Sequence, residues 1–279
     1  MTAPAPGAER RLAILGGGQM GGAILARALA AGLYAPEHVT VSDADPGARD
    51  RLARDLGVRT LFDAPAAVRD ASCVLLALKP QVMPHVGREL HGRLAPGQVV
   101  LSIMAGIEVA TLQDALGHDA VIRAMPNTPA QVGQGVTAWC ATPAVSAGAR
   151  DEVRALLRAV GTELEVDHER YLDMVTAVSG SGPAWAMLLI EAMTDAGVNL
   201  GLRRDWAYEL VLQTLAGSVA LARETGRHPA DLRNSVTTPG GTTAAGLATM
   251  ERAGVRAGLA DGIAAAYQRA IDLGAAARR

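Results

Sequence analysis

The sequence predicts an α/β fold in its first part and an all-helical fold in its second part. Short apolar runs alternate with helical stretches up to about residue 167, a glycine-rich turn follows the first of these runs, and strand signals then stop. Alternating strands and helices are typical of a parallel sheet with right-handed crossovers. We therefore predict a disordered lead-in over 1–10, a Rossmann dinucleotide-binding domain over 11–167, and a helical domain over 168–279.

The expected strands are short and continuously apolar, which suits strands covered on both faces of a sheet. They lie at residues 11–15, 39–42, 73–78, 99–103 and 121–124, with two last strands at 136–140 and 163–166 joined by a helix over 146–160. Helices of the second part are expected at 169–178, 183–200, 205–225 and 244–275. Such Ala- and Leu-rich helices often bury an apolar stripe against a second copy, so we expect the helical part to form a homodimer or larger assembly.

Composition argues against several classes of function. The formal net charge is −2 and no basic run is interleaved with aromatic residues, so we expect no nucleic-acid partner. The most apolar stretch, 183–202, contains Glu191 and Asp195, which a membrane span rarely tolerates. Cys73 and Cys140 suit a reduced compartment, and the N-terminus lacks the apolar core of a signal peptide. We therefore expect a cytoplasmic protein, and we single out no metal-binding residues.

Gly16, Gly18 and Gly21 have the G-x-G-x-x-G spacing, after a strand and at the start of a helix. The first glycine permits the tight turn, the second lets the backbone approach a pyrophosphate, and the third allows close packing of helix on strand. The helix N-terminus adds free N–H groups and partial positive charge. The pattern therefore predicts dinucleotide binding rather than an ordinary glycine-rich turn.

The sequence leaves the choice between NADH and NADPH open. Asp43 ends the second strand, close to the offset of about 20 residues after the glycine motif that is expected for a ribose-binding carboxylate. A carboxylate there accepts hydrogen bonds from a free 2′-hydroxyl and repels a 2′-phosphate, which favours NADH. Alternatively, Ser42 or Asp45 faces the ribose, and Arg49 or Arg51 approaches a phosphate.

Two further loops follow core strands and so fall at the edge of the sheet where the cofactor is expected. Lys79, the only lysine in the sequence, and Pro80 follow one strand; the alternative there is a turn with a solvated lysine. In the segment MPNTP, two prolines favour extended backbone, and Asn127 and Thr128 can direct polar groups at a carboxamide. The alternative for this segment is a rigid loop between strands.

Two glycine-rich segments precede helices in the second part. Ser179 to Gly182 expose backbone donors where Pro183 starts a helix, and the pattern is not the G-x-S-x-G of a serine nucleophile. Pro239, Gly240, Gly241, Thr242 and Thr243 precede a helix expected to begin near Ala244. Free N–H groups and hydroxyls there suit a small carboxylate. In both cases a plain helix cap is the alternative.

Five segments, in this order, resemble the pyrroline-5-carboxylate reductase family: LAILGGGQMGGAIL, LALKPQ, IRAMPNTPAQVGQGVTA, AVSGSGPAW and VTTPGGTT. The similarity runs from about residue 11 to residue 275. It implies reduction of 1-pyrroline-5-carboxylate, a small cyclic imine carboxylate, to L-proline with NADPH or NADH. It also implies a Rossmann domain followed by a helical dimerisation domain, which interlocks into dimers and in some members into rings of dimers.

The resemblance also implies roles for matching residues. For the cofactor these are Gly16, Gly17, Gly18, Gln19, Met20 and Gly21 in the glycine loop, Ser42 and Asp43 beside it, Ala77, Leu78, Lys79 and Pro80 along the cleft, and Met125, Pro126 and Asn127 at the nicotinamide. For the substrate they are Ser179, Pro239, Gly240, Gly241, Thr242 and Thr243. Thr243 matches the threonine that hydrogen-bonds the ring nitrogen and is the candidate catalytic residue.

Two positions depart from the family pattern, and three other functions compete with the one it implies. Glu224 lies further from the His-Pro pair than the glutamate of some members, and Asp43 is acidic where others are basic or neutral. The competitors are another imine or β-hydroxyacid reductase, a non-catalytic NAD(P)-binding regulator, and a transferase that uses Ser181. The absence of lysine beyond residue 79 counts against the hydroxyacid type.

Overall fold

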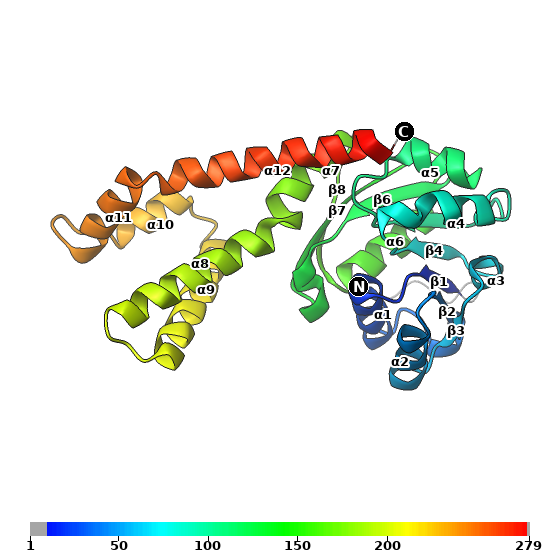
Figure 1. The fold of residues 1–279 in the computed structure, drawn as a ribbon, viewed down its shortest axis with the longest axis horizontal. Coiled ribbons are helices and arrows are strands. Elements are labelled where there is room, and N and C mark those ends of the chain that lie inside the picture. The colour runs from blue at the N-terminus through cyan, green and yellow to red at the C-terminus, as the bar shows by residue number, and fades with distance from the viewer. Residues whose placement is uncertain (1–9, 278–279) are drawn as a thin grey trace. The chain divides into compact units, whose positions relative to one another are not determined.

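The computed structural model describes residues 10–277 and contains an eight-stranded sheet followed by a run of helices (Figure 1). The lead-in expected over 1–10 lies, apart from residue 10, outside the described residues. Contacts divide the chain into two units: the first ends at Ser181 and resumes at Ala266, and the second is Gly182–Ala265. The predicted boundary at 167/168 stays a prediction.

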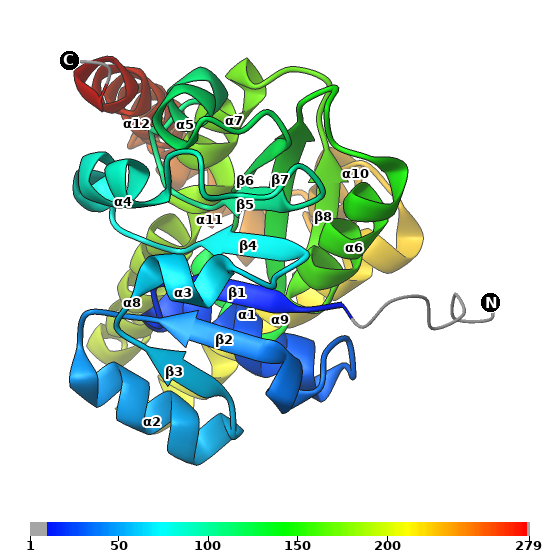
Figure 2. The ribbon, with the colours of Figure 1, turned by 90° about the vertical axis from the view of Figure 1, so that its right-hand side faces the viewer.

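The sheet of the first unit has the order β3-β2-β1-β4-β5-β6-β7-β8 (Figure 2). Its strands are β1 (Leu12–Leu15), β2 (Val39–Ser42), β3 (Arg59–Leu61), β4 (Cys73–Leu76), β5 (Val99–Ser102), β6 (Val121–Met125), β7 (Gly135–Ala141) and β8 (Gly161–Glu165). Seven of these were expected, whereas the short edge strand β3 was not. The sequence gives β3 little signal because it has three residues, none of them fully buried.

The expectation of a parallel sheet is wrong for one pair of strands. β6 and β7 pair antiparallel, with Met125 opposite Ala138, while every other neighbouring pair is parallel. Only residues 126–134 connect β6 to β7, and a parallel return needs a crossover of a dozen or more residues. β7 therefore turns back, and the helix α6 (Ala147–Arg158) then brings β8 parallel to β7.

Helices cover both faces of the sheet and bury alternate side chains of each strand. The first unit contains α1 (Gln19–Ala30), α2 (Pro46–Leu56), α3 (Ala64–Val68), α4 (Met83–Leu90), α5 (Val109–Leu116), α6, and α7 (Arg170–Val175). Helices α1, α2 and α6 pack with Ile14 and Leu75 on one face. Helices α3, α4 and α5 pack with Leu15 and Leu76 on the other. This two-sided burial explains why the strands are continuously apolar.

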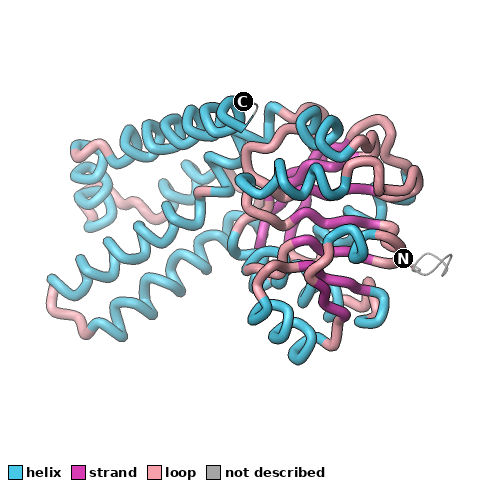
Figure 3. The backbone as a smooth tube through the Cα atoms, turned by 45° about the vertical axis from the view of Figure 1, so that its right-hand side comes forward, coloured by secondary structure: helices cyan, strands magenta, loops and turns pink. Residues whose placement is uncertain are grey.

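The second unit contains helices and no strand among its residues (Figure 3). They are α8 (Gly182–Asn199), α9 (Arg204–Thr225), α10 (Pro229–Ser235), α11 (Thr242–Arg252) and α12 (Val255–Ala277), whose last residues count with the first unit. The single helix expected over 244–275 is a wrong prediction, because Gly254 has a φ of 77° and separates α11 from α12. Helix α10 was not expected.

Helices α8 and α9 form an antiparallel pair, and Gly197 permits their close approach because a Cβ there would lie 3.1 Å from that of Ala207. Few side chains of this unit are buried, and Thr194, Ala207 and Val211 are the buried ones among residues 182–265. Large apolar side chains are instead exposed: Met187, Leu188, Leu189, Met193, Leu200, Leu202, Trp206, Tyr208, Leu210, Val219, Leu221, Val236, Met250, Val255 and Leu259. An apolar surface of this extent indicates an interaction face.

Candidate active site

The glycine-rich turn lies between β1 and α1, at the point where the strand order of the sheet reverses. β1 pairs with β2 on one side and with β4 on the other, which is the topological switch point where α/β sheets bind ligands. Gly16 has a φ of 102°, a value that favours glycine, and a Cβ there would overlap the carbonyl oxygen of Ala77. A Cβ on Gly21 would overlap the carbonyl oxygen of Gly16. The turn itself therefore requires both glycines.

Gly18 differs from these two glycines, because nothing lies within 4 Å of a Cβ built on it. It precedes α1 without a side-chain cap, Gln19 is exposed, and Met20 packs partly against the core. A hollow of about 410 Å³ adjoins this side of the turn, lined by Gly18, Gln19, Gly22, Arg51, Leu52, Asp55 and Leu56. Uncapped helix amides beside open space are what a pyrophosphate needs, so the residues present fit a dinucleotide.

Asp43 follows β2 and holds the glycine turn through its carboxylate. Its Oδ2 accepts a hydrogen bond from the Gly17 N–H at 2.6 Å, and its Oδ1 accepts one from the Asp45 N–H at 2.8 Å. Asp45 in turn caps α2, since its carboxylate accepts from the N–H groups of Gly47 and Ala48. Of the two aspartates that the sequence offered for the ribose, Asp43 is the one in contact with the glycine turn.

Ser42, the third residue offered for the ribose, has a buried side chain. Its hydroxyl donates to the carbonyl oxygen of Phe62 at 3.0 Å, while its own carbonyl oxygen accepts the Gly16 N–H at 2.8 Å. Ser42 therefore supports the turn through its backbone, and its hydroxyl is directed to the chain after β3.

The segment Ala77–Pro80 leaves β4 directly beside the glycine turn. The Ala77 N–H donates to the carbonyl oxygen of Leu15 at 2.8 Å, and Leu78 packs partly against the core. Lys79 is exposed and precedes a short 3₁₀ turn that begins at Pro80. The structure thus brings this segment and Gly16 together, as expected from parallel strands that end at one edge of the sheet.

Asn127 follows β6 and connects three segments of the first unit. Its Oδ1 accepts from the Val136 N–H at 2.9 Å, and its Nδ2 donates to the carbonyl oxygen of Ser179 at 3.1 Å. Pro126 before it is buried. The amide side chain therefore ties the end of β6 to the start of β7 and to the turn that precedes α8.

Ser179 belongs to a π-helical turn, Thr176–Gly180, which the sequence did not reveal. A Cβ on Gly180 would lie 3.0 Å from Cε of Met125, so the turn packs against the residue that ends β6. The Ser179 hydroxyl donates to the carbonyl oxygen of Val175 at 3.1 Å. Single π turns inside helices occur frequently at functional sites.

A buried ion cluster, also missed from the sequence, joins α7 to β6. Arg123, whose side chain is 3% exposed, contacts Glu169 at 2.7 Å and Asp173 at 3.0 Å. Glu169 additionally accepts the Val109 N–H at 2.8 Å. Helical spacing places the two carboxylates on one face of the chain around α7, and the arginine fixes α7 next to the strand that carries Met125. A buried arginine in an apolar strand run was the signal available in the sequence.

Cys140 on β7 lies near this cluster. Burial and the negative charge of Glu169 raise the pKa of its thiol from 9.0 to about 11. Burial also raises the pKa of Cys73 in β4. Both cysteines are free.

The segment Pro239–Thr243 lies in the second unit, at the start of α11. Gly240 has a φ of 71°, which favours glycine, and a Cβ on Gly241 would require the Thr238 side chain to move. Helix α11 begins at Thr242 rather than near Ala244, and Gly241 provides no side-chain cap. The first turn of α11 therefore presents backbone amides together with the half-buried Thr243.

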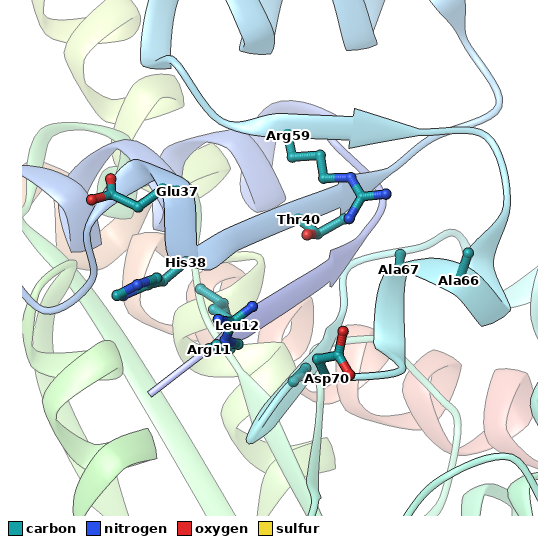
Figure 4. Close-up of a pocket in the computed structure, with 10 residues that line it drawn as sticks. Arg11, Leu12, Glu37, His38, Thr40, Arg59, Ala66, Ala67 and Asp70 are labelled. Carbon is teal, nitrogen blue, oxygen red and sulfur yellow. The ribbon is translucent and has the colours of Figure 1, made fainter. Parts of the chain in front are cut away.

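A smaller hollow of about 60 Å³ lies at the opposite edge of the sheet, where β1, β2 and β3 begin (Figure 4). Its lining includes Leu12, Thr40 and Arg59. Within residues 10–277 there is no group of three or more His, Cys, Asp or Glu side chains placed to hold a metal ion. In the same part of the chain, every helix is too short or too polar to cross a membrane.

Comparisons with known proteins match both parts of the chain. Residues 11–106 match the family model described as NADP oxidoreductase coenzyme F420-dependent, and residues 169–273 match the one described as pyrroline-5-carboxylate reductase dimerisation. A pyrroline-5-carboxylate reductase from Synechocystis sp. is 44% identical over 264 residues, covering 95% of this chain and 98% of the relative.

Solved structures give the same result. The structure of a pyrroline-5-carboxylate reductase from Coxiella burnetii has a TM-score of 0.88 at 32% identity, covering 95% of this chain and 98% of that one. A pyrroline carboxylate reductase from Plasmodium falciparum, with NADP bound, has a TM-score of 0.87 at 27% identity, covering 96% of this chain and 100% of that one. The resemblance and the fold class expected from the sequence are thereby confirmed, and the chain belongs to the pyrroline-5-carboxylate reductase family.

Proposed function

We propose that this protein reduces 1-pyrroline-5-carboxylate to L-proline with NADH or NADPH, the last step of proline synthesis. The observation that carries the proposal is that the glycine turn and the segment Met125–Asn127 end up at one edge of one sheet, in a chain that belongs to this family over almost its whole length. When bound, the nicotinamide cofactor supplies a hydride to the C=N carbon of the substrate.

The local geometry supports the proposed cofactor-binding roles. The uncapped amides at Gly18 and Gln19 hold the pyrophosphate, and Asp43 is placed for the adenosine ribose. Ala77 to Pro80 line the cleft beside the turn. Met125, Pro126 and Asn127 border the nicotinamide, where the buried proline and the two-sided hydrogen bonding of Asn127 hold the loop rigid.

The substrate-binding roles belong to Ser179 and to Pro239–Thr243. The amides of Thr242 and Thr243 suit the carboxylate, because a helix N-terminus favours an anion, whereas the Gly241 N–H donates to the Thr238 carbonyl oxygen at 3.0 Å. Thr243 orients the ring nitrogen by a hydrogen bond. A hydroxyl is a poor proton donor, so the substrate either binds as the protonated iminium or takes its proton from water. Catalysis then rests mainly on alignment and on the exclusion of bulk water.

The protein assembles as a homo-oligomer in this proposal. Residues 169–273 match the dimerisation model, and the exposed apolar side chains of the second unit supply a surface for it. We further propose a cytoplasmic location, which two free, buried cysteines support.

The test is a spectrophotometric assay of the purified protein. NADH and NADPH are each supplied with pyrroline-5-carboxylate, with its six-membered homologue, or with no imine. We expect imine-dependent oxidation of a cofactor, fastest with the five-membered ring, and proline as the product by chromatography. Cofactor oxidation with the six-membered ring alone would assign a different imine reductase. Binding of the cofactor without any oxidation would support a regulator instead.

A further inference from the structure

The carboxylate of Asp43 is fixed in one orientation against the glycine turn. Gly17 N–H donates to one of its oxygens at 2.6 Å and Asp45 N–H to the other at 2.8 Å. In Rossmann sheets the residue at the end of the second strand faces the adenosine ribose, where NADH has a 2′-hydroxyl and NADPH a 2′-phosphate. The position that distinguishes the two cofactors thus contains an immobilised negative charge.

Backbone N–H groups around Asp43 already donate hydrogen bonds to carboxylates of the chain. Asp43 takes the amides of Gly17 and Asp45, and Asp45 takes those of Gly47 and Ala48. A phosphate group depends on such amides and on guanidinium groups for its binding. A 2′-phosphate placed here would therefore receive no hydrogen bonds from these four amides, and it would lie beside two carboxylates.

Two arginines are the groups that would favour a phosphate, and both are engaged with the backbone. Arg49 donates from one terminal nitrogen to the carbonyl oxygens of Asp43 and Ala44, at 2.7 and 3.1 Å. Its guanidinium also lies over the ring of Phe62, 6.0 Å from the centroid. Arg51 donates to the carbonyl oxygen of Gly17 at 3.3 Å. The backbone contacts hold both guanidinium groups in place beside the glycine turn.

We propose that Asp43 makes this protein selective for NADH over NADPH. Each carboxylate oxygen of Asp43 uses one lone pair on the backbone and keeps another, so it accepts hydrogen bonds from the ribose hydroxyls of NADH. The same charge repels a 2′-phosphate. This inference rests on the proposed function only in taking a nicotinamide dinucleotide as the cofactor.

The experiment measures binding without turnover. NADH and NADPH are titrated separately into the intact protein, without imine, and binding is followed by nicotinamide fluorescence or by calorimetry at fixed ionic strength. We expect the wild-type Kd for NADH to be at least ~10-fold lower than that for NADPH, equivalent to ~1.4 kcal/mol. We expect Asp43→Ser to shift the ratio of the two Kd values by at least ~10-fold towards NADPH.

Asp43→Asn is the second variant, because it removes the charge while keeping an oxygen that accepts the Gly17 N–H. It should shift the ratio in the same direction as Asp43→Ser. The variant should stay folded, with a lower unfolding temperature than the wild type, because its amide nitrogen replaces the oxygen that accepts the Asp45 N–H. Asp50→Asn is the matched control: it removes the same charge from an exposed position of α2 and should leave the ratio unchanged.

Three outcomes would overturn the proposal: tighter wild-type binding of NADPH, an unchanged ratio in the folded Asp43→Asn variant, or an equal shift in Asp50→Asn. If the wild type prefers NADPH and Arg51→Gln loses NADPH binding, Arg51 is the residue that binds the 2′-phosphate. Selective binding of NADH without imine reduction would instead overturn the proposed reaction and keep this inference. Turnover with NADPH alone would support the proposed reaction and overturn this inference. Binding of neither cofactor would overturn both.

Discussion

The side chain of Asn127 donates a hydrogen bond from Nδ2 to the carbonyl oxygen of Ser179, 3.1 Å away. The same side chain accepts the Val136 N–H at 2.9 Å, so both ends of the amide are used. One residue thereby sets the position of the π turn that carries Ser179 relative to the end of β6. Gly180, the residue after Ser179, packs against Met125, which ends β6.

Replacing Asn127 by Asp should impair catalysis more than folding. Aspartate keeps an oxygen for the Val136 N–H but places a carboxylate oxygen against the Ser179 carbonyl oxygen. Loss of such a hydrogen bond costs about 1–2 kcal/mol, and we expect kcat/KM to fall by about 10-fold or more. Steady-state kinetics and thermal unfolding provide the measurement. Gln131→Glu, the same chemical change at an exposed position of this loop, is the control and should have wild-type kinetics.

Alanine at Gly18 and at Gly21 should separate cofactor binding from folding. A Cβ on Gly18 meets no protein atom within 4 Å, so Gly18→Ala should cost less than about 1 kcal/mol of stability. Its methyl group would occupy the approach of the pyrophosphate, and we expect dinucleotide binding to weaken by at least ~10-fold.

In contrast, a Cβ on Gly21 would overlap the Gly16 carbonyl oxygen, and Gly21→Ala should lose about 1–3 kcal/mol of stability. Chemical denaturation and nucleotide titration of both variants test the pair. Wild-type affinity in Gly18→Ala would show that the cofactor does not approach this face of the turn.

Thr243→Ala should keep the fold and cofactor affinity but reduce turnover by at least ~10-fold, equivalent to ~1.4 kcal/mol of barrier. The reason is the loss of the hydroxyl proposed to orient the ring nitrogen. Thr249→Ala on the same helix is the matched control, since the Thr249 hydroxyl donates to the Ala245 carbonyl oxygen within α11. Unchanged kcat in Thr243→Ala, measured with saturating cofactor, would remove Thr243 from the mechanism.

Cys140 should make stability depend on pH in the alkaline range. Its pKa is raised from 9.0 to about 11 in the folded protein, so between these values the unfolded chain releases a proton that the folded protein keeps. The stabilising contribution is complete below pH 9 and is lost as pH rises through about 11. Urea denaturation of wild type and Cys140→Ala at pH 8 to 11 should show a steeper decline for the wild type. Equal slopes would mean that the thiol is not shielded.

Most strands and the cofactor-binding edge were predictable because their signals are local. Continuous apolar runs identify strands covered on both faces, and the glycine spacing identifies the turn after β1. The direction of β7 was not recognised, although the short connection over residues 126–134 determines it. The break between α11 and α12 was missed because the apolar pattern continues across Gly254, whose positive φ ends the first helix.

Side-chain partners far apart in the sequence were beyond prediction. Nothing local to Arg123 indicates that Glu169 and Asp173 meet it, because α7 has to pack on β6 before the three charges come together. The choice among Ser42, Asp43 and Asp45 was open for the same reason: in an extended segment, small changes of backbone direction decide which side chain faces the glycine turn.

The sequence by itself determined the alternation of strands and helices, the dinucleotide turn and the family, because periodicity and glycine spacing are properties of neighbouring residues. Only the tertiary structure decided that Asp43 binds the Gly17 amide, that Asn127 holds Ser179, and that Arg123 fixes α7. These contacts join residues separated by 26, 52 and 46 positions. Their geometry exists only once the sheet and its covering helices have packed.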